Sequence, residues 1–235
     1  MNKIAYKRVI IKLSGEALAG DKGNGIDNAT LDRVTDQIAK VKSMGAEIGL
    51  IVGGGNFWRG RQGAEMDRST ADYMGMLATA MNALCVQDAL IRKGVPTKVQ
   101  TALDISRVAD AFDIRKAKES LDKGEVVIFA CGTGNPFFTT DTAAALRGAE
   151  IGAEVLLLAK NVDGIYDSDP KLNPNAKKYD TVSYQEYIAK GLKAMDTTAI
   201  TLCMENDIKV LAFGLFEENS LVRAISGENV GTLIK

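Results

Sequence analysis

Short apolar segments alternate with amphipathic ones along most of this chain. Val9-Ile10-Ile11-Lys12-Leu13 is rich in β-branched residues and stops at Ser14-Gly15, which predicts a buried strand that enters a tight turn. Similar runs predict further strands over 46–52, 126–130, 154–159, 209–213 and 231–234. Apolar positions at helical spacing predict one helix that is capped by Asp27 or Asn28 and ends at Gly45, and others over 71–93, 114–123, 142–151, 183–190 and 197–207.

The order of these elements predicts the fold class. Strands that alternate with helices of ten or more residues form right-handed βαβ units. We therefore expect an α/β fold with a mainly parallel sheet that helices cover on both faces. The segment 162–180 departs from the pattern as a polar loop, with Pro170, Pro174 and a short hairpin at 162–166. Because no linker, repeat or low-complexity tract interrupts the 235 residues, we expect a single domain over 1–235.

The composition excludes several classes of function. The chain has no histidine, so Ser-His-Asp triads, histidine-activated cysteines and histidine-bound zinc are ruled out. Its 29 Lys+Arg against 30 Asp+Glu give a net charge of −1, which argues against a nucleic-acid partner.

The cysteines and the apolar runs indicate the compartment. Cys85, Cys131 and Cys203 are odd in number and widely spaced, as expected of buried thiols in a reducing environment. No apolar stretch of signal-peptide length follows the basic N-terminus, and the purest apolar runs are strand-sized. We therefore expect a cytoplasmic protein with no membrane partner.

Glycine-rich turns follow three predicted strands, at 14–15, 53–55 and 132–134. In parallel sheets, ligands bind at the carboxyl ends of the strands. In Lys12-Leu13-Ser14-Gly15, a strand-end lysine and free backbone N–H groups suit a phosphate. The alternative is a lysine that only extends its ammonium into water. Gly20-x-x-x-x-Gly25 is not a Walker A loop, because Ile26 follows where that loop has lysine.

The second turn is Gly53-Gly54-Gly55-Asn56, with Arg59 and Arg61 close behind. Consecutive glycines cost folding entropy, so they mark the close approach of a ligand or of another backbone. A following arginine can bind phosphate oxygens. The spacing is not Gly-x-Gly-x-x-Gly, which disfavours a dinucleotide-binding fold. A tight structural turn is the alternative interpretation.

The third turn leads from Gly132 through Phe137-Phe138 to Thr140-Asp141, at the start of a predicted helix. Hydroxyl groups and a helix N-terminus suit an anion, and the phenylalanines offer apolar surface for a ring. Alternatively, one of the two phenylalanines belongs to the core, and Thr140 or Asp141 is only the helix cap.

Two further groups of polar residues lie near these turns. Asp72 heads the long predicted helix, where it can accept hydrogen bonds from a sugar, hold an arginine, or serve as a dipole-compensating cap. After the strand at 154–159, Tyr166 can stack on a purine, while Asp163 and Asp169 are too few for a calcium loop.

Taken in order, these motifs resemble the amino acid kinase family, in particular the branch whose members phosphorylate UMP. The resemblance extends from the first strand to Gly231-Thr232-Leu233. Its most discriminating part is Thr133-Gly134-Asn135-Pro136-Phe137-Phe138-Thr139-Thr140-Asp141, which separates this branch from carbamate and acetylglutamate kinases. The resemblance implies a three-layer αβα sandwich that transfers the γ-phosphoryl group of ATP to UMP, giving UDP and ADP in pyrimidine nucleotide biosynthesis.

The resemblance also implies which residues act in this reaction. Lys12, Arg59 and Asp141 would be catalytic, with Asp141 organising Lys12. The residues implied for ATP are Lys12, Leu13, Ser14, Gly15, Gly55, Arg59, Asn161, Tyr166 and Asp169. Those implied for UMP are Gly54, Asp72, Thr133, Gly134, Asn135, Pro136, Phe137, Phe138, Thr139 and Thr140. Lys160 either reaches a phosphate or is solvated.

The chemistry needs neither a histidine nor a protein metal cage. The acceptor is a phosphate oxygen that is ionised at neutral pH, so no general base is required. Mg²⁺ would be held mainly by the nucleotide phosphates and water, and no protein ligands for it are predicted. The resemblance further implies a homohexamer, inhibition by UTP and an allosteric effect of GTP. The segment implied for GTP is Gly20, Asp21, Lys22, Gly23, Asn24 and Gly25, which is otherwise an ordinary mobile loop.

Three other functions are weighed against this one. A sibling kinase with an acyl or carbamate acceptor is disfavoured by the 137–141 run. A hydride-transfer enzyme is disfavoured by the missing dinucleotide motif. A non-catalytic uridine-nucleotide sensor on the same fold is disfavoured by the presence of Lys12, Arg59 and Asp141 together.

Overall fold

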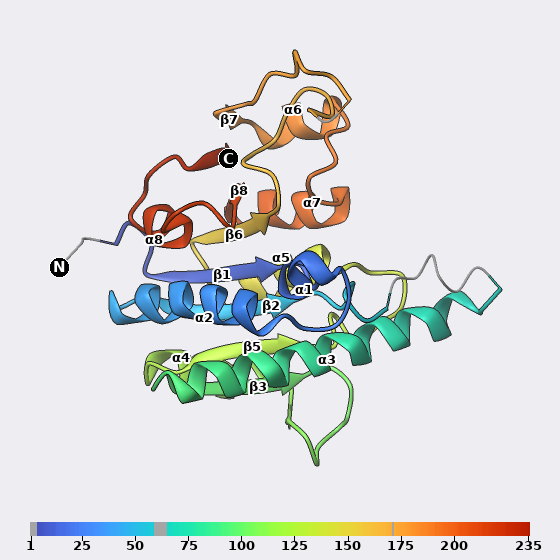
Figure 1. Ribbon diagram of the computed structural model, residues 1–235, viewed down its shortest axis with the longest axis vertical. Coiled ribbons are helices and arrows are strands. Elements are labelled where there is room, and N and C mark those ends of the chain that lie inside the picture. The colour runs from blue at the N-terminus through green and yellow to red at the C-terminus, as the bar shows by residue number, and fades with distance from the viewer. Residues whose placement is uncertain (1–3, 59–64, 171) are drawn as a thin grey trace.

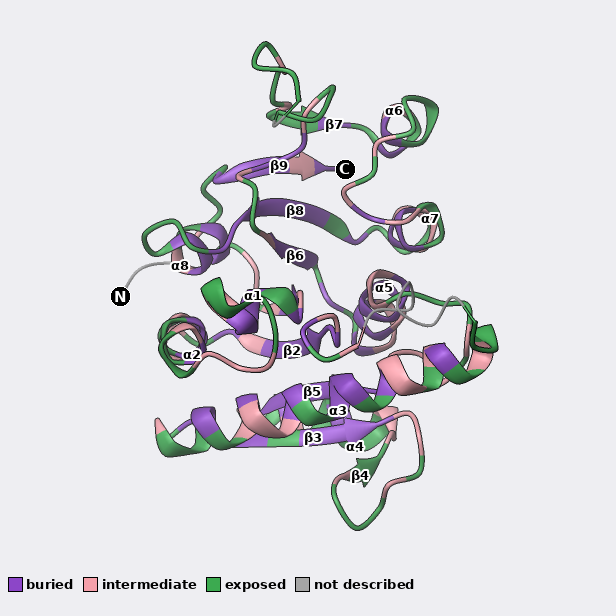
Figure 2. Ribbon diagram, turned by 45° about the vertical axis from the view of Figure 1, so that its right-hand side comes forward, coloured by how far each residue is buried: buried purple, intermediate pink, exposed green. Residues whose placement is uncertain are grey.

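The computed structural model describes residues 4–58, 65–170 and 172–235. Within them, one sheet has the strand order β4-β3-β5-β2-β1-β6-β8-β9-β7 (Figures 1 and 2). Its strands are β1 (Arg8–Leu13), β2 (Glu47–Val52), β3 (Thr97–Thr101), β4 (Asp110–Ala111), β5 (Val126–Ala130), β6 (Val155–Lys160), β7 (Thr181–Val182), β8 (Lys209–Gly214) and β9 (Gly231–Ile234). Neighbouring strands are parallel except β8 and β9. The predicted, mainly parallel sheet is confirmed.

Helices lie on both faces of this sheet. They are α1 (Glu16–Ala19), the 3-10 turn η1 (Gly20–Lys22), α2 (Asn28–Ser43), α3 (Arg68–Arg92), α4 (Ile114–Asp122), α5 (Thr140–Ile151), α6 (Tyr184–Ala189), α7 (Thr197–Glu205) and α8 (Ser220–Ile225). One apolar cluster joins the sheet to α2, α3 and α8, and a second joins its other face to α4, α5 and α7. Buried residues concentrate in the strands and on the sheet-facing sides of the helices (Figure 2). The result is the expected three-layer αβα sandwich.

The side chains of strand β1 alternate between the two apolar clusters on either face of the sheet. Successive side chains of a strand point to opposite faces. Val9, Ile11 and Leu13 therefore belong to the first cluster and Ile10 to the second, all fully buried. Lys12 shares the face of Ile10, so its side chain points toward the layer that holds α5. This placement decides which loops its ammonium can reach.

The helix starts confirm one of the predicted caps and correct two. The side chain of Asp27 caps α2 by accepting from the N–H of Thr30 at 2.9 Å, as one of the two alternatives predicted. Helix α3 begins at Arg68 and is capped by Asp67, so Asp72 lies inside the helix and is not its cap. Helix α5 is capped by Thr139, and neither Thr140 nor Asp141 has that role.

Some elements were not predicted by the hydrophobic pattern. Strand β3 alternates poorly, because Thr97, Gln100 and Thr101 are polar and nevertheless buried. Helix α1 is too short, at four residues, to show helical periodicity. The hairpin predicted at 162–166 is wrong: the segment forms bends, and Tyr166 makes an isolated antiparallel bridge with Lys178.

Helix α3 is the one helix in the described chain that is long and apolar enough to cross a membrane by length and composition. Half of its most apolar stretch is buried, and it packs against β2, β3 and β5 as part of the core. Cys131 and Cys203 are buried free thiols, as predicted, and Cys85 is partly buried. Burial raises the pKa of the Cys203 thiol to about 12, so this thiol stays protonated and unreactive.

Candidate active site

The three glycine-rich turns lie at one edge of the sheet. They follow β1, β2 and β5, which are parallel, and the register pairs Leu13 with Val52 and Ile51 with Phe129. The segment after β6 joins the same edge, because Leu13 also pairs with Ala159. The predicted gathering of loops at the carboxyl ends of the strands is confirmed.

Two glycines of the first two turns, Gly15 and Gly54, are needed for close packing between backbones. A Cβ added to Gly15 would lie 2.6 Å from the Gly53 oxygen and 2.7 Å from the Gly55 nitrogen. A Cβ on Gly54 would lie 2.7 Å from the Gly75 oxygen in α3. At Gly55, by contrast, an added Cβ would meet only the Glu16 side chain, at 3.5 Å. Close approach of another backbone therefore explains Gly15 and Gly54, whereas Gly55 has room in front of it.

Lys12 and Asp141 form a buried ion pair at the centre of this edge. The Lys12 Nζ atom lies 2.7 Å from Asp141 Oδ1, and the two side chains are 9% and 16% exposed. Asp141 Oδ1 is fully buried and has no partner in hydrogen-bond geometry, so the contact is one between charges. The alternative in which Lys12 only extends into water is wrong.

Lys160 adds a second cation beside this pair. It is the last residue of β6 and is partly buried. Burial lowers the pKa of its ammonium, the charge of Asp141 opposes that shift, and the charge of Lys12 reinforces it. The charge of Glu16 also opposes the shift. Two lysines thus lie near each other in a partly dry setting, which favours the binding of an anion. The alternative of a simply solvated Lys160 is not supported.

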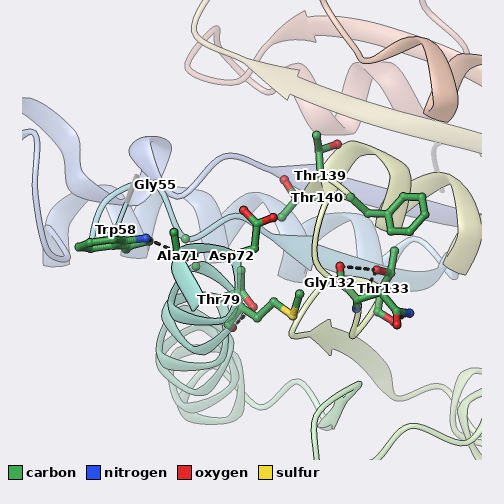
Figure 3. Close-up of a pocket in the computed structure, with 14 residues that line it drawn as sticks. Gly55, Trp58, Ala71, Asp72, Thr79, Gly132, Thr133, Thr139 and Thr140 are labelled. Atoms are coloured by element: carbon green, nitrogen blue, oxygen red, sulfur yellow. Dashed lines mark hydrogen bonds between the residues drawn. The ribbon is translucent and has the colours of Figure 1, made fainter. Parts of the chain in front are cut away.

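A cavity of about 150 Å³ opens between α3 and the third turn (Figure 3). It contains most of the residues implied for UMP: Gly54, Asp72, Thr133, Asn135, Phe138, Thr139 and Thr140. Gly134, Pro136 and Phe137 do not line it. Residues with no predicted role in UMP binding also line it: Trp58, Ala71, Gly75, Met76 and Thr79. In Figure 3, Asp72 extends from α3 toward the 132–140 segment. We call this the acceptor cavity, because it contains most of the residues that the family resemblance implies for the acceptor, UMP.

Asp72 joins α3 to the third turn. Its Oδ2 atom accepts a hydrogen bond from the Phe137 N–H at 2.8 Å and another from Arg68 Nε at 3.0 Å. The Arg68 guanidinium also lies over the Phe137 ring, 5.3 Å from its centre. Of the interpretations of Asp72, the one in which it holds an arginine is confirmed.

The two phenylalanines of the third turn are both outside the core. Phe137 is 66% exposed and Phe138 is 51% exposed, so the expectation that one of them packs in the core is wrong. Phe137 also has φ at +72°, a left-handed conformation that side chains rarely adopt. Strain of this kind persists where surrounding contacts enforce it, and the bond to Asp72 is such a contact.

Of the residues implied for ATP, Gly55 lines the acceptor cavity, and Asn161, Tyr166 and Asp169 are divided between two other cavities. Tyr166 and Asp169 line a cavity of about 440 Å³ between 162–170 and 190–194. The Tyr166 hydroxyl donates to Asp163 Oδ1 at 2.7 Å, and this bond raises the pKa of the tyrosine. Asn161 instead lines a cavity of about 540 Å³ on the other side of β6. A third opening, lined by Asp141, Lys160 and 191–197, lies beside the ion pair.

Further predicted site residues are Leu13, the 20–25 segment and Arg59. Leu13 is fully buried in the core, so only its backbone is available. Gly20, Asp21 and Lys22 line the cavity that holds Asn161, whereas 23–25 do not. Arg59 lies outside the described residues.

Asp196, which no sequence motif indicated as a site residue, links the third turn to α7. Its carboxylate accepts hydrogen bonds from the Thr139 hydroxyl, from the Thr142 hydroxyl at 3.1 Å and from the Ala199 N–H at 2.9 Å. An aspartate directly before a predicted helix indicates a cap. The contact with Thr139, 57 residues away, left no local signal.

No group of three acidic, cysteine or histidine side chains able to hold a metal occurs in residues 4–58, 65–170 and 172–235. A protein-held metal cage is therefore not part of the described site. Lys12, Lys160 and the turn backbones suit phosphate oxygens, and those oxygens can supply ligands to a metal that arrives with a nucleotide.

A buried pair of Lys12 and Asp141, the nearby cation of Lys160 and the glycine turns define a phosphate-handling site of the phosphotransferase type. Comparison with known proteins agrees: residues 7–213 match the model of the amino acid kinase family. The chain therefore belongs to the amino acid kinase family, whose members are phosphotransferases.

Solved structures of UMP kinases are similar over nearly the whole chain. The enzyme from Bacillus anthracis is 36% identical with a TM-score of 0.95, covering 98% of this chain and 96% of that one. The UMP kinase from Ureaplasma parvum is 38% identical with a TM-score of 0.92, covering 97% and 98%. A uridylate kinase from Archaeoglobus fulgidus is 28% identical with a TM-score of 0.71, covering 97% and 99%.

Proposed function

We propose that this protein is a UMP kinase that transfers the γ-phosphoryl group of ATP to UMP. The observation that carries the proposal is the buried Lys12–Asp141 pair. Asp141 lines the opening that also contains Lys160, and the preceding residue, Thr140, lines the acceptor cavity. The similarity to two UMP kinases at 36% and 38% identity supports the choice of acceptor. Pyrimidine nucleotide synthesis in the cytoplasm is the matching role, and the whole chain is expected to act as one domain.

The reaction can be assigned to this chain's own groups. An ionised phosphate oxygen of UMP forms the new P–O bond, while the bond from the γ-phosphorus to the bridging oxygen breaks and ADP leaves. Lys12 and Lys160 stabilise the charge on the transferred oxygens, and Asp141 fixes the position of Lys12. Mg²⁺ bound with ATP would neutralise phosphate charge. With an ionised nucleophile, no side chain has to remove a proton.

The experiment that tests the proposal is a coupled assay for ADP with Mg-ATP and UMP, CMP, dUMP or AMP as the acceptor. We expect UDP as the product by chromatography, with a strong preference for UMP. If UMP binds in calorimetry but no nucleotide is phosphorylated, the protein is a sensor instead. Phosphorylation of a carbamate or acyl acid would identify the sibling kinase activity.

Asp72 is expected to recognise the ribose of UMP. Its carboxylate faces the acceptor cavity and already receives Arg68 and the Phe137 N–H, which fix its orientation. We predict that Asp72→Asn raises the KM for UMP by about tenfold through loss of a charge-assisted hydrogen bond. The KM for ATP should stay near its original value. Equal changes in both KM values would contradict a ribose contact.

Lys160 is expected to set the alkaline limit of activity. Because burial lowers the pKa of this ammonium, the charged form is lost at a lower pH than for an exposed lysine. The alkaline limb of kcat/KM should therefore lie below the ordinary lysine range. Lys160→Arg, which keeps its charge at all relevant pH values, should move that limb upward. An unchanged limb in this variant would remove Lys160 from the mechanism.

Regulation by UTP and GTP is part of the proposal. UTP resembles UMP and is expected to compete for the acceptor cavity. The segment Gly20–Gly25 is the candidate for the GTP effect, because it lies next to the cavity that holds Asn161. A change of UMP phosphorylation rate on adding GTP tests this role, and an unchanged rate contradicts it.

Helix α3 is the expected surface between copies. Tyr73, Leu77 and Met81 follow one another at helical spacing and are 42%, 47% and 52% exposed. An exposed apolar stripe of this kind is typical of a subunit interface. We expect a homohexamer built from dimers that pair through α3. Sedimentation should show dissociation for Leu77→Glu with Met81→Glu, and a monomeric unaltered protein would contradict the assembly.

A further inference from the structure

Two asparagines form a buried amide pair behind the second glycine turn. Asn56 is 4% exposed and Asn82, in α3, is fully buried. Asn56 Nδ2 donates to Asn82 Oδ1 at 3.0 Å, and Asn82 Nδ2 donates to Asn56 Oδ1 at 2.7 Å. Their positions are 26 residues apart, so the pair is a tertiary contact and not a local turn.

The remaining donors of the pair are also used. Asn56 Nδ2 donates a second hydrogen bond to the Gly25 oxygen at 2.7 Å, and Asn82 Nδ2 donates one to the Gly53 oxygen at 2.7 Å. Each side-chain amide thus has both N–H groups and its oxygen bonded. A buried polar network that is fully satisfied enforces one arrangement, because any shift leaves a costly unpaired group.

The pair joins the 20–25 segment, which the family resemblance implies for GTP, to the 53–55 turn, which it implies for ATP and UMP. The Gly25 N–H also donates to the Asn56 backbone oxygen at 3.0 Å, so the 20–25 segment is held to Asn56 twice. On the other side, a Cβ added to Gly15 would lie 2.5 Å from Asn56 Oδ1. The turn beside Lys12, the 53–55 turn and the 20–25 segment therefore all rest on Asn56.

Another buried polar side chain lacks this connecting property. Thr35 in α2 is fully buried. Its hydroxyl donates to two backbone oxygens of the same helix, that of Leu31 at 2.8 Å and that of Asp32 at 3.2 Å. The Thr35 hydroxyl is therefore hydrogen-bonded without connecting α2 to any other part of the chain. The bonds of Asn56 and Asn82 instead run between three separate parts of the chain.

We propose that the Asn56–Asn82 pair positions the 53–55 turn for phosphoryl transfer and makes its geometry depend on the position of the 20–25 segment. Asn82 acts through Asn56, and both are positioning residues. The proposal rests on the proposed phosphoryl transfer for its kinetic consequence. Its structural part, the coupling of α3 to the 20–25 segment, holds independently of the substrate.

The test uses Asn82→Ser and Asn82→Ala, because Asn82 does not contact the 20–25 segment through its own hydrogen bonds. Thr35→Ala is the matched control, a buried polar residue outside the site. Hydrogen exchange is followed by mass spectrometry in peptides that cover 20–25. Thermal unfolding identifies any variant that does not fold, and Asn82→Ser, which keeps a polar group, serves if Asn82→Ala does not.

We expect exchange in 20–25 to be about tenfold faster in the Asn82 variants and unchanged in the control. The kcat for UMP phosphorylation should fall by about tenfold, with the KM for UMP nearly constant. Asn56→Ser combined with Asn82→Ser should lower kcat by less than the product of the single effects. Unchanged exchange in 20–25 would overturn the coupling. Faster exchange without an effect on kcat would overturn the positioning role.

Should the unaltered protein not phosphorylate UMP, the proposed function fails and the exchange experiment still decides whether the segments are coupled. The two failures are therefore distinguishable. A loss of GTP response in Asn82→Ser, with a response kept in Thr35→Ala, would further support transmission from the 20–25 segment through this pair. A GTP response of unaltered size in Asn82→Ser would contradict transmission by this route.

Discussion

Lys12→Ala is expected to lower the kcat for UMP phosphorylation by about 10²–10³-fold, the scale of removing one group that stabilises transition-state charge. Lys12 is buried, and its ammonium lies 2.7 Å from Asp141 Oδ1. Its charge is needed most when negative charge builds up on the transferred oxygens. The variant should therefore bind UMP almost as well as the unaltered protein.

The measurement is kcat by the coupled assay, with the Kd for UMP from calorimetry. Lys98→Ala is a suitable control, because Lys98 is an exposed lysine of the same sheet, on β3. A turnover unchanged in Lys12→Ala would remove Lys12 from catalysis. A loss of UMP affinity as large as the loss of kcat would show that Lys12 acts in ground-state binding.

The layers of the fold were predictable because their signals are local. The run Val9 to Leu13 is fully apolar apart from Lys12, and it stops at a glycine turn, so the strand and its end are visible in a short window. The same holds for the strands that end before 53–55 and 132–134. Once these strands are parallel, their loops must share an edge, which places the site without further information.

Strand β3 shows where the pattern fails. Buried Thr97 and Thr101 satisfy their hydroxyls with the backbone oxygens of Val95 and Leu103, both at 2.9 Å. A strand whose buried residues are polar but locally satisfied has no apolar signature. The sequence window therefore resembles a loop, and the strand is recognised from its pairing with β5 and β4.

Contacts across long sequence separations explain the remaining errors in the site. Phe137 was expected to be core or ligand surface on composition alone, whereas its position depends on Asp72, 65 residues earlier. The Asn56–Asn82 pair and the bonds of Asp196 are equally invisible locally. The pairing of Lys12 with Asp141 was expected from the family resemblance and not from spacing. Side-chain contacts between loops can thus be recognised only from the structure or from similarity to a known family.

Asp141→Asn is expected to lower kcat by about 10²-fold and to destabilise the protein. Removing one partner of a buried ion pair leaves the other charge uncompensated, which costs about 3–5 kcal/mol in the free energy of unfolding. The Lys12 side chain is 9% exposed, so water can screen it only slightly. Asp141 is also the group whose charge most strongly supports the ammonium of Lys160. Its loss should lower the pKa of Lys160 further, moving the alkaline limb of kcat/KM down.

A double variant separates stability from activity at this pair. Lys12→Met with Asp141→Leu replaces both charges with apolar groups, which commonly restores the stability that a single removal takes away. We expect its free energy of unfolding in urea to exceed that of Asp141→Leu alone, while its kcat stays as low as that of Lys12→Ala. Asp110→Asn, at an exposed carboxylate on β4, should change neither quantity. A double variant that regained activity would show that the pair is structural. One that stayed as unstable as Asp141→Leu would show that the buried Lys12 charge is not the cause of the destabilisation.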